Sequence, residues 1–86
     1  MPSPVVLVGH RHSCPFHGDG RVTTGTKGGM VRDKLVACVG DRISCGATII
    51  SGSPGASLHG KPVARKGDTT DHGGTLEEGD SSCLVP

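Results

Sequence analysis

The stretch Gly60–Asp68, GKPVARKGD, decides how the rest of the chain is interpreted, because an earlier segment repeats it. Shifted back by 27 positions, it lies over Asp33–Asp41, DKLVACVGD, with Lys, Val, Ala, Gly and Asp identical. The N-terminal segment Pro4–Gly9 repeats the pattern more faintly. Internal repeats of this kind organise a whole fold. We therefore interpret the chain as three degenerate copies, over about residues 2–32, 33–59 and 60–86.

Each copy contains short runs that favour β-strands. Leu35–Val39 and Thr48–Ile50 are apolar or β-branched and are bounded by Gly and Asp, which is typical of strands. The Gly-Asp pairs at 40–41 and 67–68 are suited to tight turns. One copy cannot bury an apolar face alone, but three copies around an axis can share a thin core. The sequence therefore predicts an all-β, three-sided unit of short strands and glycine turns.

The composition indicates one small domain with few large side chains. The chain has 86 residues, of which 15 are Gly and only Phe16 is aromatic. A chain of this length buries only ~60% of its unfolded surface. We therefore expect residues 1–86 to form a single domain that needs a metal, disulfides or a partner chain for stability.

Charge and patterning exclude several classes of function. Lys and Arg number 9 against 8 Asp and Glu, which gives a net charge of +1 and no basic field for nucleic acid. No run reaches the ~20 apolar residues of a membrane span, and the N-terminus lacks the basic leader of a signal peptide. The sequence contains neither a Gly-x-Ser-x-Gly elbow nor a phosphate-binding glycine loop. We therefore expect a protein that is not an enzyme.

One position of the repeat carries residues that bind metals. Five residues after an equivalent glycine, the three copies place Cys14, Cys45 and His72. The first copy is four residues longer after this position, and the extra segment contains His17. Zinc in structural sites takes four tetrahedral nitrogen or sulfur ligands. The repeat therefore predicts one closed, structural Zn²⁺ site made by Cys14, His17, Cys45 and His72.

Two further histidines lie close to this position. His10 stands where the other copies have Asp, and His12 stands where they have Ile43 and Thr70. Either could replace His17 as the fourth ligand.

The remaining cysteines and histidine fall at positions that repeat no donor. Cys38 aligns with Arg65 and Cys83 aligns with Ala56, so we interpret both as ordinary strand cysteines. A Cys38–Cys83 disulfide is the alternative, although a reducing compartment disfavours it. His59 precedes a Gly-Lys-Pro turn and is expected at the surface.

The repeated motifs resemble a known family. Pro62–Arg65 resembles the Pro-Ala-Ala-Arg signature with one conservative change. Gly67-Asp68, His72–Gly74 and Ser44–Pro54 stand around it as they do in the PAAR-repeat domain, and Cys14–Gly18 resembles another of its elements. The resemblance covers essentially the full chain, and the first copy is the most degenerate.

This resemblance implies a small cone whose broad base caps the trimeric VgrG spike of a type VI secretion system. It also implies a zinc ion near the sharp tip, held by Cys14, His17, Cys45 and His72, with His12 or His10 open as replacements. Effector proteins as cargo, transient contact with a target membrane, and cytoplasmic assembly before secretion with the spike are further implications. Two other classes compete: a free zinc-binding adaptor or metallochaperone, and a disulfide-stapled secreted mini-protein.

Overall fold

The computed structural model describes residues 3–14 and 18–86, which form short β-strands and no helix. The side chains of residues 14, 18, 19 and 27 are outside this description. The strands are β1 (Ser3–Val5), β2 (Arg11–Cys14), β3 (Gly18–Arg21), β4 (Thr26–Val31), β5 (Lys34–Val36), β6 (Ser57–Leu58), β7 (Lys61–Pro62), β8 (Thr75–Leu76) and β9 (Asp80–Val85). The all-β prediction is confirmed.

A ring of backbone hydrogen bonds joins the three copies at the centre of the molecule. The Val6 N–H donates to the Ala64 carbonyl (3.0 Å), Ala37 N–H to Val6 (2.9 Å) and Ala64 N–H to Ala37 (2.9 Å). These residues are equivalent in the repeat, and all three are fully buried. The three-repeat fold is therefore confirmed, with one chain arranged about a pseudo-threefold axis.

The central segment of each copy pairs with a different neighbour at each end, which keeps the regular strands short. The predicted strand over 35–39 is divided for this reason: β5 ends at Val36, and Cys38 forms a bridge to Val63 of the next copy. The predicted strand over 48–50 forms only isolated bridges, Arg42 to Thr48 and Ile49 to Thr70.

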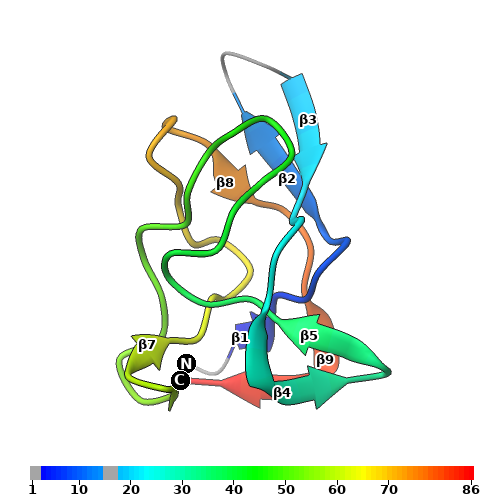
Figure 1. Cartoon of the computed structure of the whole chain (residues 1–86), viewed down its shortest axis with the longest axis vertical. Helices are drawn as coiled ribbons and strands as arrows, with labels where there is room; N and C mark the ends of the chain where they lie inside the picture. The colour runs from blue at the N-terminus through cyan, green and yellow to red at the C-terminus, as the bar shows by residue number, and fades with distance from the viewer. Residues whose placement is uncertain (1–2, 15–17) are drawn as a thin grey trace.

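Three two-stranded sheets join neighbouring copies, and we call these three junctions the seams. The last strand of each copy pairs antiparallel with the first strand of the next: β4 with β5, β6 with β7, and β9 with β1. Tight turns at Arg32-Asp33 and His59-Gly60 connect the first two pairs through positive φ angles, as two-residue hairpin turns require. His59 is exposed, as predicted. Figure 1 shows these sheets together at one end of the molecule, which we call the base.

The opposite end, which we call the tip, consists of the β2–β3 hairpin and two loops, residues 43–47 and 70–74. The ribbon narrows from the base to this end (Figure 1), in a molecule of 29 × 25 × 23 Å. The predicted conical, three-sided shape agrees with this arrangement.

The core has two layers on either side of the central ring. The tip-side layer packs Val6, Val22, Ala37, Ile43, Ala47, Ile49, Ala64 and Leu76. The base-side layer packs Val5, Leu7, Val36, Cys38 and Val63, partly covered by residues of the seam strands. Because strand side chains alternate between faces, each central segment contributes to both layers.

Each seam also depends on one glycine that lies against the next copy. A Cβ atom built at these positions would lie 2.4 Å from Leu35 Cβ for Gly25, 2.9 Å from Pro62 Cβ for Gly52 and 2.6 Å from Pro4 Cβ for Gly79. These three glycines are equivalent in the repeat. The close approach of the copies therefore requires a residue without a side chain at this position.

Candidate functional site

The signature arginine, Arg65, and the buried Asp68 three residues later form a hydrogen-bonded group, which we call the bracket. Asp68 accepts hydrogen bonds from the Arg65 N–H (2.7 Å), Nε (3.1 Å) and Nη2 (3.0 Å), and from the Ser51 hydroxyl (3.0 Å). The hydrogen bonds with Asp68 raise the pKa of the Arg65 guanidinium. Arg65 also donates from Nη1 to the Pro86 carbonyl at 2.9 Å. The signature arginine therefore holds the turn and the base together.

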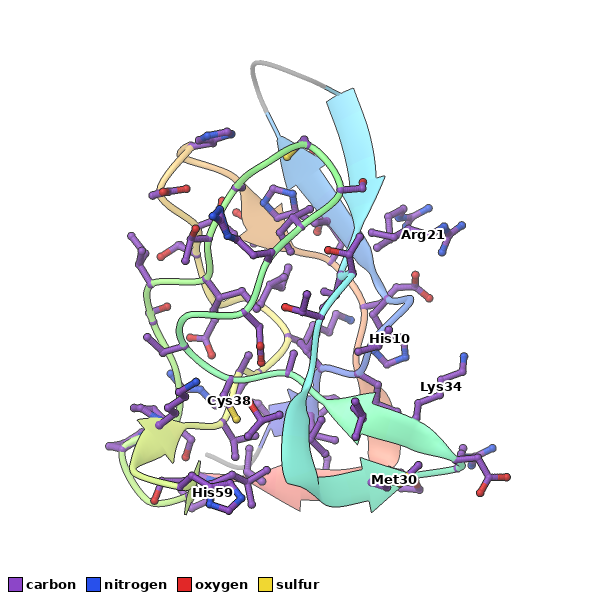
Figure 2. The ribbon with its side chains drawn as sticks, viewed as in Figure 1. His10, Arg21, Met30, Lys34, Cys38 and His59 are labelled. Atoms are coloured by element: carbon purple, nitrogen blue, oxygen red, sulfur yellow. The ribbon has the colours of Figure 1, made fainter. Side chains whose placement is uncertain are left out.

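In the other two copies, the residues equivalent to Asp68 are Asp41 and His10, and they make different hydrogen bonds. Asp41 accepts from the Cys38 N–H at 2.8 Å and from the Thr26 hydroxyl at 3.0 Å. In the first copy, His10 Nδ1 accepts from the Leu7 N–H at 3.1 Å. Burial lowers the pKa of His10, which keeps Nδ1 unprotonated as this bond requires. His10 therefore replaces a structural aspartate, and Figure 2 shows it on the flank, away from the tip.

Two tip loops place Cys45 and His72 at equivalent positions. Gly46 N–H donates to the Ile43 carbonyl (2.9 Å), and Gly73 N–H donates to the Thr70 carbonyl (3.1 Å). Gly46 and Gly73 have φ angles of +92° and +78°, which are readily accessible to glycine. Both loops are thus tight turns. In each, the predicted metal ligand, Cys45 or His72, immediately precedes a glycine with a positive φ angle.

His12 lies beneath these loops in the tip-side core. It is fully buried, and its Nε2 lies 2.9 Å from the Thr70 hydroxyl. Its Nδ1 is buried and has no hydrogen-bond partner among the described side chains. Burial, followed by the nearby charge of His72, lowers the pKa of His12. An imidazole with Nε2 beside the Thr70 hydroxyl, and with Nδ1 lacking a partner among the described residues, therefore lies below the tip.

The structure places three of the predicted metal ligands, Cys14, Cys45 and His72, at the tip, but it describes them unequally. Cys14 ends β2 and pairs with Gly18, its side chain is not described, and His17 lies outside the described residues. Cys45 is a free, half-buried thiol, and the His72 side chain is 29% exposed with Nε2 4.0 Å from Asp71 Oδ1. Among the side chains that the structure describes, which exclude those of residues 14–19, no three His, Cys, Asp or Glu side chains meet as a metal-binding group. The predicted zinc site remains a prediction.

The base contains an apolar hollow of about 530 Å³. Three equivalent valines of the central segments, Val5, Val36 and Val63, line it together with Met30 and Leu58 and other seam residues. Met30 is 60% exposed, and Figure 2 shows it at the base. The hollow therefore presents apolar surface to solvent on the pseudo-threefold axis.

The two cysteines outside the tip both belong to the base. Cys38 is fully buried in the base-side layer, and burial raises the pKa of its thiol. Cys83 lies in β9 and lines the hollow. Both thiols are free, so the disulfide alternative is not observed between them.

Sequence reasoning did not find the hollow or assign the bracket of Arg65, Asp68 and Pro86. A signal for the hollow was present, because Val5, Val36 and Val63 hold the same repeat position. The repeat alone does not say whether this position faces the base or the tip. That depends on how the three copies pair with one another, through contacts between residues far apart in the sequence.

Comparison with known proteins gives one family. The model described as the PAAR motif matches residues 2–51 and, in a second register, residues 16–78. No curated protein matches the chain. In the described part of the chain, no helix has the length and apolar character needed to cross a membrane.

Proposed function

The chain belongs to the PAAR-motif family, and from this premise we propose that it caps the trimeric VgrG spike of a type VI secretion system. PAAR-motif proteins are structural, and as a family they bind this spike. In our proposal the base of this chain faces the end of the VgrG trimer, and the tip points outward as a non-enzymatic puncturing point. Assembly in the cytoplasm, export with the spike and carriage of effector proteins belong to the same proposal.

The observation that supports this function most strongly is the threefold arrangement of the base. A homotrimer presents the same group three times around its axis, and this base presents Val5, Val36 and Val63 in the same way around a hollow. One copy of this chain, with its pseudo-threefold symmetry, can therefore match the end of a true trimer. The three valines are themselves buried, and the exposed apolar side chain of the hollow is that of Met30; exposed apolar surface marks an interaction site.

The seam strands add a second reason for docking at the base. Each base sheet has only two strands, so in the described fold β4, β6 and β9 each pair with a single neighbour. Strands at the end of a β-rich trimer also leave unpaired backbone groups. Unpaired edges invite pairing with another chain, and covering both sets at one interface removes the aggregation hazard of each.

At the tip we propose a structural Zn²⁺ ion bound by Cys14, Cys45 and His72, with a histidine as the fourth donor. The donor set fits zinc, since thiolates and imidazoles are its usual structural ligands. The buried His12 Nδ1, which has no partner in the described part of the chain, is an atom that a metal would satisfy. When bound, the ion would cross-link loops that only a thin core supports.

Docking is tested by mixing the chain with a trimeric VgrG spike protein and measuring co-migration by size-exclusion chromatography. Met30→Asp puts a charge in the hollow and should reduce the bound fraction at least about tenfold. Ile50→Asp is the matched control, because Ile50 is 56% exposed, close to the 60% of Met30, but does not line the hollow.

Docking should also protect the Cys83 thiol from alkylation, since Cys83 lines the same hollow. Equal loss of binding in both variants, or unchanged binding of Met30→Asp, would contradict docking through the base. A chain that remains monomeric beside every spike trimer but binds zinc reversibly would instead support the metallochaperone alternative.

A further inference from the structure

We propose that the outer side of the β2–β3 hairpin carries a phosphate-binding site, made by the guanidinium groups of Arg11 and Arg21 and by the Ser44 hydroxyl. The ligand is a phosphate group, either as a free ion or as the headgroup of a membrane lipid. This inference depends neither on docking at the base nor on a metal at the tip. It assigns a role to charged side chains that the fold itself does not require.

The site is a solvent-open pocket of about 430 Å³, which we call the arginine pocket. Its lining residues are Arg11, Gly20, Arg21 and Ser44. The two arginines and Ser44 are exposed, whereas Gly20 is buried, and Figure 2 shows Arg21 at the outer side of the hairpin. A Cβ atom at Gly20 would lie 2.8 Å from Ser44 Oγ. The absence of a side chain at Gly20 therefore lets the Ser44 hydroxyl lie against the hairpin, beside the arginines.

The two arginines are neighbours across a strand pair. In the register of β2 and β3, Arg11 lies directly opposite Arg21, and like charges at such positions destabilise a sheet. Arg21 Nη1 donates to the Gly9 carbonyl at 2.9 Å and lies 3.9 Å from Glu78 Oε1. Among the described side chains, the Arg11 guanidinium has no hydrogen-bond or ion-pair partner. The fold therefore brings two positive charges together and leaves most of their N–H donors to solvent.

The repeat shows that the fold does not need these charges. The equivalent cross-strand pair occurs once in each copy, as Arg11 with Arg21, Arg42 with Thr48, and Thr69 with Thr75. The third copy makes this pair with two uncharged threonines, and the second copy makes it with one arginine. Strand pairing is thus compatible with threonine at both positions, and only the first copy concentrates two positive charges there.

The donors of the arginine pocket match a phosphate group. Each guanidinium offers five N–H donors in a planar fork, which binds phosphate oxygens in pairs. Ser44 Oγ accepts from the Arg21 N–H at 3.0 Å, so the hydroxyl can donate its own hydrogen to a ligand. A phosphate monoester carries a charge of about −1.5 to −2 at pH 7, close to the charge of the two arginines. A bound phosphate would therefore relieve the repulsion between Arg11 and Arg21.

Two acidic residues lie beside Arg11, on the side away from the pocket. The Glu77 N–H donates to the Arg11 carbonyl at 2.9 Å, and Glu78 Oε1 accepts from the Arg11 N–H at 2.8 Å. Neither glutamate is among the residues that line the arginine pocket. Both therefore hold the backbone of β2 at Arg11 and leave the described lining of the pocket positively charged.

The experiment titrates inorganic phosphate into the whole chain at constant ionic strength and follows ¹H–¹⁵N NMR signals. We expect the backbone amides of Gly20, Arg21 and Ser44 to shift together. Arg11→Thr and Arg21→Thr introduce the residue found at equivalent positions, so both variants should fold, and each should weaken phosphate binding at least about tenfold. Arg42→Thr is the matched control, because it removes the same charge outside the pocket and should change the affinity less than about threefold.

Two further arms identify the source and the chemistry of the ligand. Co-sedimentation with phosphatidylcholine vesicles that contain phosphatidic acid, lost in Arg21→Thr, would identify a lipid headgroup as the ligand. Phosphate-induced shifts without vesicle binding would identify free phosphate. The proposal is overturned if tens of millimolar phosphate shift none of these amides, if acetate binds as tightly as phosphate, or if Arg42→Thr loses as much affinity as Arg21→Thr.

The outcome is independent of docking to the spike. The arginine pocket lies on the hairpin of the tip and the docking surface lies at the base, so Arg21→Thr should still co-migrate with a VgrG trimer. Loss of phosphate binding with retained docking supports the site. Failure of every variant to dock would concern the proposed function and leave the phosphate titration intact.

Discussion

Replacing Asp68 with alanine tests how much of the stability depends on the buried bracket of the third copy. The carboxylate accepts three hydrogen bonds from Arg65 and one from Ser51, and it is 6% exposed. Leaving the Arg65 N–H without an acceptor costs ~1–3 kcal/mol. Loss of the ion pair adds about 1 kcal/mol, because the Arg65 side chain is 25% exposed and partly screened by solvent. We expect a total loss of roughly 3 kcal/mol.

The assay is thermal unfolding followed by far-UV circular dichroism at pH 7 with a fixed zinc concentration. For a domain of this size, 1 kcal/mol corresponds to ~4–8 °C in Tm, so Asp68→Ala should lower Tm by roughly 12–24 °C. Asp68→Asn retains an acceptor for the Arg65 N–H and should lose about half as much.

Asp41→Ala is the internal control for the charge of Arg65. Asp41 fills the same bracket in the second copy, but its partners are the Cys38 N–H and two threonine hydroxyls. The Asp68→Ala loss should therefore exceed the Asp41→Ala loss by about 1 kcal/mol. If Asp68→Ala lowers Tm by less than about 4 °C, or Asp68→Asn is as damaging as Asp68→Ala, the reasoning is refuted.

Two other predictions concern the first copy and its contacts. Gly74→Ala should destabilise the fold by ~1–3 kcal/mol in urea unfolding, because the new Cβ would clash with the Ser13 carbonyl and the His12 ring; an unchanged midpoint would contradict this packing. His10 has a folded-state pKa below its ordinary value of 6.5, so the unfolded chain binds more protons, and its contribution to stability should fall as pH drops below about 6.5. His10→Asp restores the acceptor of the other copies and should lessen the stability loss between pH 7 and pH 5; an identical pH dependence would contradict the role given to Nδ1.

The repeat register was the part of the fold that the sequence could predict well. Aligning Gly60–Asp68 with Asp33–Asp41 made Val63 equivalent to Val36 and Ala64 equivalent to Ala37. In the structure these residues make equivalent contacts in and beside the central ring. Local patterns overestimated the strands at 35–39 and 48–50, because a residue run cannot show that its two ends pair with different copies.

The candidate site was predictable in part for a similar reason. Repetition identified Cys14, Cys45 and His72 as one position, and the structure places Cys45 and His72 in matching tip turns. Repetition could not show that His10 accepts a hydrogen bond from the Leu7 N–H, or that His12 Nδ1 is buried without a partner among the residues that the structure describes. Both properties depend on contacts made after folding, which differ between copies although the sequence position is the same.

The three seams of the base differ in the order in which a folding chain can form them. Lys61 pairs with Leu58 and Lys34 pairs with Val31, across turns of two residues, whereas Pro4 pairs with Leu84, 80 residues away. The entropy of loop closure grows by ~0.6 kcal/mol for each doubling of the loop, so the third seam costs about 3 kcal/mol more to close. We therefore expect folding to form the two local hairpins early and to close the ring last, by docking β9 onto β1.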